Sequence, residues 1–168
     1  SGNGLVTITG NVWSEGDTSG SRTLTITSTG EMALVGSVLA TGSNHVFTKA
    51  GTGLLTMTGG ASTFLGAANV TAGTLRVTDI GALNAASGYA SVVFASGGRL
   101  EYSDTGQTWS KGLLNNNTTS ILAAEGTGAL IVGSNIGNYA TGLKTLALGG
   151  TSLLANELQG IVTNNTVG

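Results

Sequence analysis

The sequence of 168 residues contains no cysteine and no proline. Without cysteine, neither a disulfide bond nor a thiolate metal site can form, although this absence does not by itself assign the chain to a compartment. Charged residues make up only 8% of the chain, against roughly a quarter in an average globular domain. Six bases and eight acids are spread without any run of one sign, so the sequence lacks the basic stripe that binds nucleic acid or an anionic membrane. We therefore expect no nucleic-acid partner.

Long apolar runs are also missing. The uncharged stretch from Ile80 to Gly98 is interrupted by asparagine, serine and glycine residues, so it does not have the character of a membrane-spanning helix. We expect no membrane insertion. The chain begins at Ser1 and ends in a segment typical of a turn. We therefore expect residues 1–168 to be one domain and a segment of a longer repeat protein.

Short β-strands are what the sequence has in quantity. In "TLRVT", apolar and polar residues alternate with a period of two, which predicts Leu75 and Val77 on an inward face and Arg76 outward. Seven further segments have strand character: "LVTIT", "TLTIT", "LLTMT", "SVVFA", "RLEYS", "ALIVG" and "TLALG". By the same alternation, further inward residues are expected to be Leu24, Ile26, Leu55, Met57, Leu100, Tyr102, Leu146 and Leu148.

Glycine-rich turns separate these strands. The 29 glycines and the many threonines and serines supply turn conformations between strands that lie roughly 15 to 30 residues apart. Short strands at this spacing are compatible with a β-sandwich or barrel as well as with a solenoid. Internal repetition favours the solenoid, because "TKAGTGLLTMTGG" and "LAAEGTGALIVGS" share one pattern, and "SRTLTITSTG" and "LKTLALGGTS" share another.

A known repeat is similar to one of these stretches. The segment "KAGTGLLTMTGG...NVTAGTLRVTD", from Lys49 to Asp79, resembles the autotransporter-associated β-strand repeat, and weaker similarities occur at Arg22–Gly30, Arg99–Ser103, Gly126–Gly133 and Lys144–Gly150. The resemblance implies a right-handed parallel β-helix, exported by a bacterium and displayed as a rod outside the cell. The translocator barrel that such proteins carry is not in this sequence.

Coil geometry agrees with this resemblance. In a parallel β-helix each coil lies about 4.7–4.9 Å above the previous one, so that backbone donors and acceptors pair between coils. We interpret Lys49 to Asp79 as one such coil, with glycine at its corners and leucine and valine inside. At roughly 20–25 residues per coil, the chain supplies about seven or eight coils.

Catalytic patterns are weak. The segment "GDTSGS" at Gly16–Ser21 is similar to the nucleophile loop of trypsin-like proteases, but the only histidine, His45, follows it, so we interpret the segment as a turn and His45 as a loop or outward strand residue. Acids Glu15 and Asp17 lie two residues apart, and Glu101 lies beside Arg99. No metal site, cofactor or catalytic residue is predicted. The segment Leu113–Ser120, "LLNNNTTS", is expected to be an asparagine ladder or an excursion loop.

Aromatic residues are the candidates for contact with a ligand or partner. Trp13 and Trp109 stand beside turns, and Tyr89 and Tyr139 lie in glycine- and asparagine-containing segments. Exposed aromatic rings at these positions stack on sugar rings or on another chain, whereas buried ones close a corner or an end of the solenoid.

These observations predict a structural protein and not an enzyme. We expect an extracellular or cell-surface rod of a bacterium, whose partners are neighbouring repeats or copies of itself. A binding module of the adhesin or phage-fibre type, using the aromatic residues on surface glycans, is the alternative. A polysaccharide-degrading enzyme is the weakest interpretation, because the eight acids are scattered.

Overall fold

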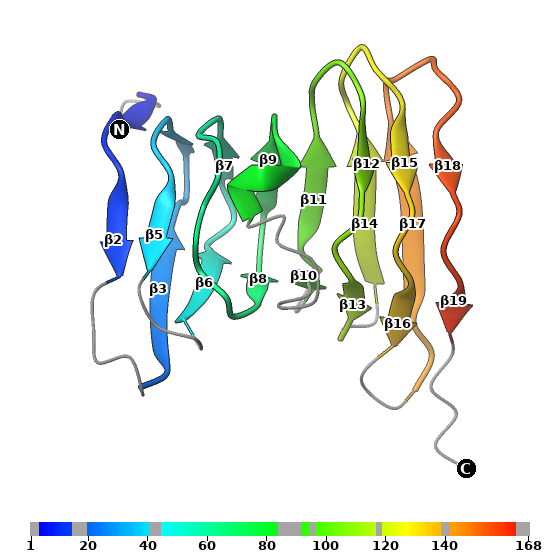
Figure 1. Cartoon of the computed structure of the whole chain (residues 1–168), viewed down its shortest axis with the longest axis horizontal. Coiled ribbons are helices and arrows are strands. Elements are labelled where there is room, and N and C mark those ends of the chain that lie inside the picture. Colours follow the sequence, from blue (N-terminus) through cyan, green and yellow to red (C-terminus); the bar gives the residue numbers. More distant parts are fainter. Residues whose placement is uncertain are drawn as a thin grey trace.

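The chain folds into a parallel β-solenoid (Figure 1). A computed structural model describes residues 4–14, 20–40, 45–83, 92–94, 97–116, 119–138 and 142–163. All strand pairs in these ranges are parallel. The prediction of a parallel β-helix is thereby confirmed and the β-sandwich is wrong; the right hand of the coil stays a prediction. None of the described segments forms a helix of the length and apolarity needed to cross a membrane.

Two sheets of seven strands run the length of the solenoid. Each circuit of the chain, called a level below, gives one strand to each sheet. The seven strands of each sheet therefore define seven levels, and about six turns of the chain lead from the first level to the last. Sheet 1 consists of β1 (Val6–Ile8), β4 (Glu31–Leu34), β7 (Leu54–Met57), β9 (Thr74–Val77), β11 (Arg99–Tyr102), β14 (Thr119–Ala124) and β17 (Thr145–Gly150). Sheet 2 consists of β3 (Arg22–Thr27), β6 (His45–Ala50), β8 (Ala68–Val70), β10 (Val92–Phe94), β13 (Leu113–Asn115), β16 (Ile136–Asn138) and β19 (Val162–Thr163).

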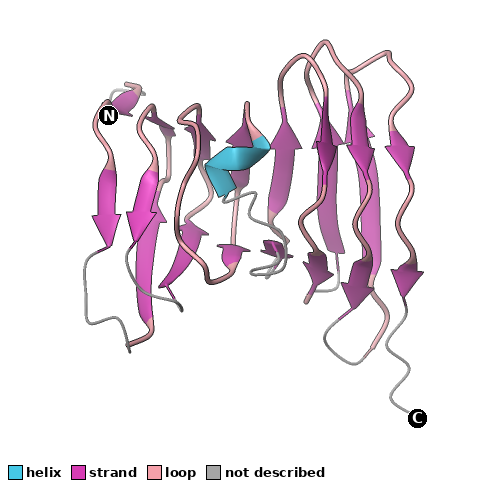
Figure 2. Cartoon of the chain, viewed as in Figure 1, coloured by secondary structure: helices cyan, strands magenta, loops and turns pink. Residues whose placement is uncertain are grey.

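A third face is regular only at its two ends. Strands β2 (Val12–Ser14) and β5 (Val38–Ala40) pair at the first two levels, and β12 (Gln107–Trp109), β15 (Leu130–Val132) and β18 (Glu157–Leu158) pair at the last three. Between them lie residues 58–66, which form neither strand nor helix, and the 3₁₀ helix η1 (Ile80–Leu83), which Figure 2 shows in the middle of the solenoid.

Side-chain and turn hydrogen bonds bridge this interruption. The backbone N–H of Val38 donates to the hydroxyl of Ser62, and Ser62 N–H donates to the carbonyl of Gly81. On the other side of η1, Ile80 N–H donates to the side-chain oxygen of Gln107. Each level of the third face is therefore connected to the next, even where no strand forms.

Like side chains stack in columns inside the solenoid. Register in sheet 1 aligns Val6, Met32, Leu55, Leu75, Leu100, Leu122 and Leu148 in one inward column. The predicted inward positions Leu75 and Val77 are fully buried, as are Leu55 and Leu100. Leu148 also lies in this inward column, as predicted, but it is 56% exposed because β17 is the last of the described strands in sheet 1.

The repeats recognised in the sequence do not occupy equivalent places. The Gly-Thr-Gly at 51–53 precedes a sheet 1 strand, whereas the one at 126–128 follows a sheet 1 strand. Within Lys49 to Asp79, "LLTM" and "TLRV" are neighbours in one sheet at successive levels, so the stretch spans one complete coil and the first strand of the next. Levels vary in length: 20 residues separate Leu55 from Leu75, and 26 separate Leu122 from Leu148.

Glycines line the corners because successive levels come closest there. A Cβ added to Gly59 would strike the backbone of Gly36, and one added to Gly36 would strike Gly10. A second corner stacks Gly73 over Gly53, and Gly53 over Gly30. The high glycine content is therefore a steric requirement of stacked corners.

Replacing Gly53 by alanine tests this requirement. The added methyl group collides with the carbonyl of Gly30, so we expect a loss of about 1–3 kcal/mol in the free energy of unfolding, measured by urea denaturation. Gly60→Ala is the matched control, because nothing lies within 4 Å of its added Cβ. Equal denaturation midpoints for the two variants would contradict the crowding of this corner.

Candidate functional site

The two tryptophans have opposite environments. Trp13 in β2 is 57% exposed, next to Val12, which packs against the core. Trp109 at the end of β12 is fully buried, and its indole N–H donates to the carbonyl of Lys111 at 2.6 Å. Tyr89 and Tyr139 lie outside the described residues. Of the two described aromatic candidates, only Trp13 offers its ring to a ligand, while Trp109 fills a corner of the core.

His45 was predicted to be a loop or outward residue, and this is wrong. It begins β6, where His45, Phe47 and Lys49 alternate on the inward face, and its side chain is 1% exposed. The strand begins directly after a turn-like "GSN" segment, which concealed its start in the sequence. Glu15 and Asp17, with most of the "GDTSGS" segment, lie outside the described residues.

Part of the asparagine-rich segment belongs to β13. Asn115 is buried at the end of β13, in register with Asn138 at the next level. Its side-chain amide donates to the carbonyl of Thr145 at 3.3 Å, and its side-chain oxygen accepts from the Ser120 hydroxyl at 2.7 Å. Residues 117 and 118 lie outside the described part.

Arginine and glutamate side chains form a network on the outer face of sheet 1. Glu101 accepts from Arg76 Nε at 2.8 Å and from Arg99 Nε at 2.5 Å, and Arg99 also reaches Glu125 at 2.5 Å. The second oxygen of Glu125 accepts from the hydroxyl and N–H of Thr151. These contacts join four successive levels, and both oxygens of each carboxylate accept a bond: Glu101 binds one arginine of its own strand and one of the previous level, and Glu125 binds the levels on either side of it.

Two lysines are buried, and the sequence analysis singled out neither. Lys49 lies in the inward column of sheet 2, and its ammonium group donates to the carbonyls of Ala50, Gly51 and Ala72 at 2.7–3.2 Å. Burial lowers the pKa of Lys49. Lys111 is 5% exposed beside the ring of Phe64, and burial lowers its pKa from 10.5 to about 8. Lysine is seldom fully buried in folded proteins, so both positions are unusual.

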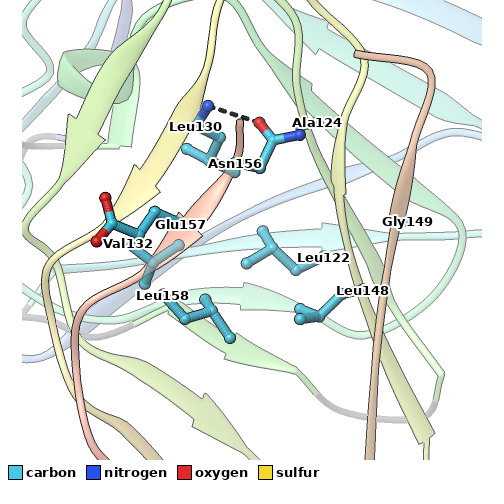
Figure 3. A pocket seen from close by; sticks show the side chains of 9 residues that line it. All are labelled: Leu122, Ala124, Leu130, Val132, Leu148, Gly149, Asn156, Glu157 and Leu158. Carbon is cyan, nitrogen blue, oxygen red and sulfur yellow. Dashed lines mark hydrogen bonds between the residues drawn. The ribbon is translucent and has the colours of Figure 1, made fainter. Parts of the chain in front are cut away.

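A pocket lies in the last two levels of the core (Figure 3). Its volume is about 70 Å³, well above the roughly 10–15 Å³ that one water molecule needs. Its apolar lining comes from sheet 1 and from the third face: Leu122, Ala124, Leu148, Leu130, Val132 and Leu158. Asn156 and Glu157 also line it, and Asn156 accepts a hydrogen bond from Leu130 N–H at 2.8 Å.

The pocket exists because one inward column loses its side chains. Register aligns Tyr102, Ala124 and Gly150 in one column. The side chains in this column therefore become smaller from level to level, from a phenol ring to a methyl group to a hydrogen atom. Neighbouring Leu122 and Leu148 remain large, which leaves a hollow between them and the third face. This apolar pocket is therefore an unfilled end of the core.

Comparison with known proteins supplies no assignment. No protein-family model, curated protein or solved structure matches the chain significantly. Within the described ranges, no three histidine or acidic side chains are grouped as metal ligands would be.

Single-tryptophan variants test the two environments. Trp109→Ala removes a fully buried indole, so we expect it to lower the free energy of unfolding by about 3–5 kcal/mol. Trp13→Ala should change it by less than about 0.5 kcal/mol and leave a blue-shifted fluorescence that acrylamide quenches poorly. Strong quenching of the remaining Trp109 would contradict its burial.

Burial of Lys111 predicts a pH dependence of stability. Between pH 8 and 10.5 the unfolded chain binds more protons at this group than the folded chain, so the free energy of unfolding should rise with pH across that window. Lys111→Met keeps the backbone carbonyl that Trp109 and Ser134 use, and should be more stable than wild type at pH 7 by up to about 3 kcal/mol. The difference should shrink by pH 9.5 in urea denaturation. A difference independent of pH would contradict a charged, buried Lys111.

Proposed function

We propose that the chain is a structural rod segment of a bacterial surface or secreted repeat protein. The observation that carries this proposal is the direction of its hydrogen bonds, which run along the rod from the first level to the last. Corners contribute as well as strands: Ser28 N–H donates to the carbonyl of Ala50, and Thr74 N–H to that of Gly53. Extension or bending along this axis breaks many bonds together, and such a structure is suited to holding a distance.

The contribution of this segment to a rod follows from the strand spacing. Seven levels at about 4.7–4.9 Å span about 29 Å. Further repeats before or after the segment would lengthen the rod by the same increment. Its weakly charged surface, with the Arg76 to Glu125 network neutralised internally, suits an exterior where ionic conditions vary.

Glycan binding is a second candidate because of Trp13. Its indole is more than half exposed on the outer face of β2, as a ring that stacks on a sugar must be. Trp13→Ala should abolish binding on a glycan array if this function holds, and Thr25→Ala, which alters another exposed side chain of the first level, is the control. The rod proposal expects no difference between these two variants.

Display on the cell tests the rod proposal directly. An antiserum raised against the 168-residue chain should label intact cells of the source organism or detect the protein in their medium. The folded chain should also resist proteinase K within its strands, because paired and buried backbone does not reach a protease site. Detection only after cell lysis, or cleavage throughout sheet 1 under native conditions, would overturn the proposal.

A further inference from the structure

The two ends of the solenoid expose opposite ends of the same columns. Val6 is 55% exposed and Leu148 is 56% exposed, and they are the first and last members of one inward column of sheet 1. In sheet 2, Leu24 begins the column that ends at Val162, which is 57% exposed. Each of these side chains is inward by register, and no described strand continues its column.

The pocket continues a column whose first member is an aliphatic residue. Ile8 and Leu34 begin the column that passes through Tyr102 and Ala124 to Gly150. Gly150 has no side chain, and the hollow of about 70 Å³ lies against Ala124 and Gly149. A second Ile8 placed one level above Gly150 would direct its side chain toward this space.

Among the described residues, no strand pairs with the outer edge of β1 or β3 at the first level, or with the outer edge of β17 or β19 at the last. At the first level, β1 and β3 carry one charged side chain, Arg22, and at the last level β17 and β19 carry none. Proline and lysine, which natural edge strands use to prevent pairing, are absent from all four. Both ends therefore accept a further parallel strand in each sheet.

We propose that the last level of one copy docks onto the first level of a second copy, head to tail. This inference rests on the proposed rod function and names its partner: β1 of the second copy pairs with β17, and its β3 pairs with β19. Val6 then covers Leu148, Leu24 covers Val162, and Ile8 enters the pocket. The contact repeats the interface between levels that the chain already forms, and because it is heterologous it propagates into a filament.

Two complementary variants test the direction of docking. Val6→Glu blocks the first level and Leu148→Glu blocks the last, so that two negative charges would meet at a junction between blocked ends. Both side chains are more than half exposed, so folding is expected to be retained. By sedimentation velocity over a concentration series, wild type should form oligomers, and each variant alone should dissociate at concentrations at least about tenfold higher than wild type. Mixed one to one, the variants should form a dimer that does not grow, since one wild-type junction is available to each pair.

Matched substitutions distinguish a charge placed in an inward column from the same charge placed on the outer surface. Thr25→Glu and Thr145→Glu place the same charges on exposed, outward positions of the first and last levels, and oligomers should persist in both. Val162→Glu tests the last level from sheet 2 and should act like Leu148→Glu. Circular dichroism and urea midpoints confirm that each variant is folded.

Several outcomes would overturn the inference. A wild-type chain that stays monomeric at millimolar concentration has ends that do not accept a second copy. Association of Leu148→Glu that equals wild type would place the contact between two first levels, and a mixture of the variants that stays monomeric would exclude the head-to-tail junction. Surface display and protease resistance with any of these results would leave the rod proposal intact, so the two failures are distinguishable.

Discussion

Backbone pairing between successive levels is the constraint on which the rest of this structure depends. Parallel strands about 4.8 Å apart require every level to retrace the previous one, in its corners as well as in its strands. At the corners this leaves no space for a Cβ, which accounts for Gly36, Gly53 and Gly59. Inside, it places similar residues over one another, which accounts for the columns of leucine, valine and methionine.

Some charged residues in this arrangement form hydrogen bonds between levels. Lys49 occupies a position in an inward column, and its ammonium group reaches a carbonyl of the next level at Ala72. On the outer face, Glu101 holds arginines from its own strand and from the previous level. Because a single level has few contacts of its own, such bonds add to the cooperativity of neighbouring levels, as expected for a solenoid.

The sequence predicted the fold from local signals, although its alignment of the repeats was wrong. Alternation correctly placed Leu75 and Val77 inward, because successive side chains of a strand point to opposite faces and the apolar face can be identified from the strand alone. The Gly-Thr-Gly motifs at 51–53 and 126–128 both lie at corners, where small residues are required. They lie at different corners, so the shared motif does not align equivalent positions. The burial of His45, Lys49, Trp109 and Lys111 depends on what the adjacent level presents, so no local pattern contains it. The pocket likewise arises from Tyr102, Ala124 and Gly150, which are far apart in the sequence.

Unequal level lengths have a consequence for how such a chain changes over evolutionary time. Between 20 and 26 residues separate column partners, yet the columns of sheet 1 remain in register, so the corners and the third face absorb the difference. Insertions and deletions in the corners and the third face do not change which side chains of the two sheets point inward and which point outward. A single residue inserted within β9 or β11 would instead reverse the orientation of the following side chains. Variation in length is thus confined to a few permissive segments, where new loops are acquired without altering the core.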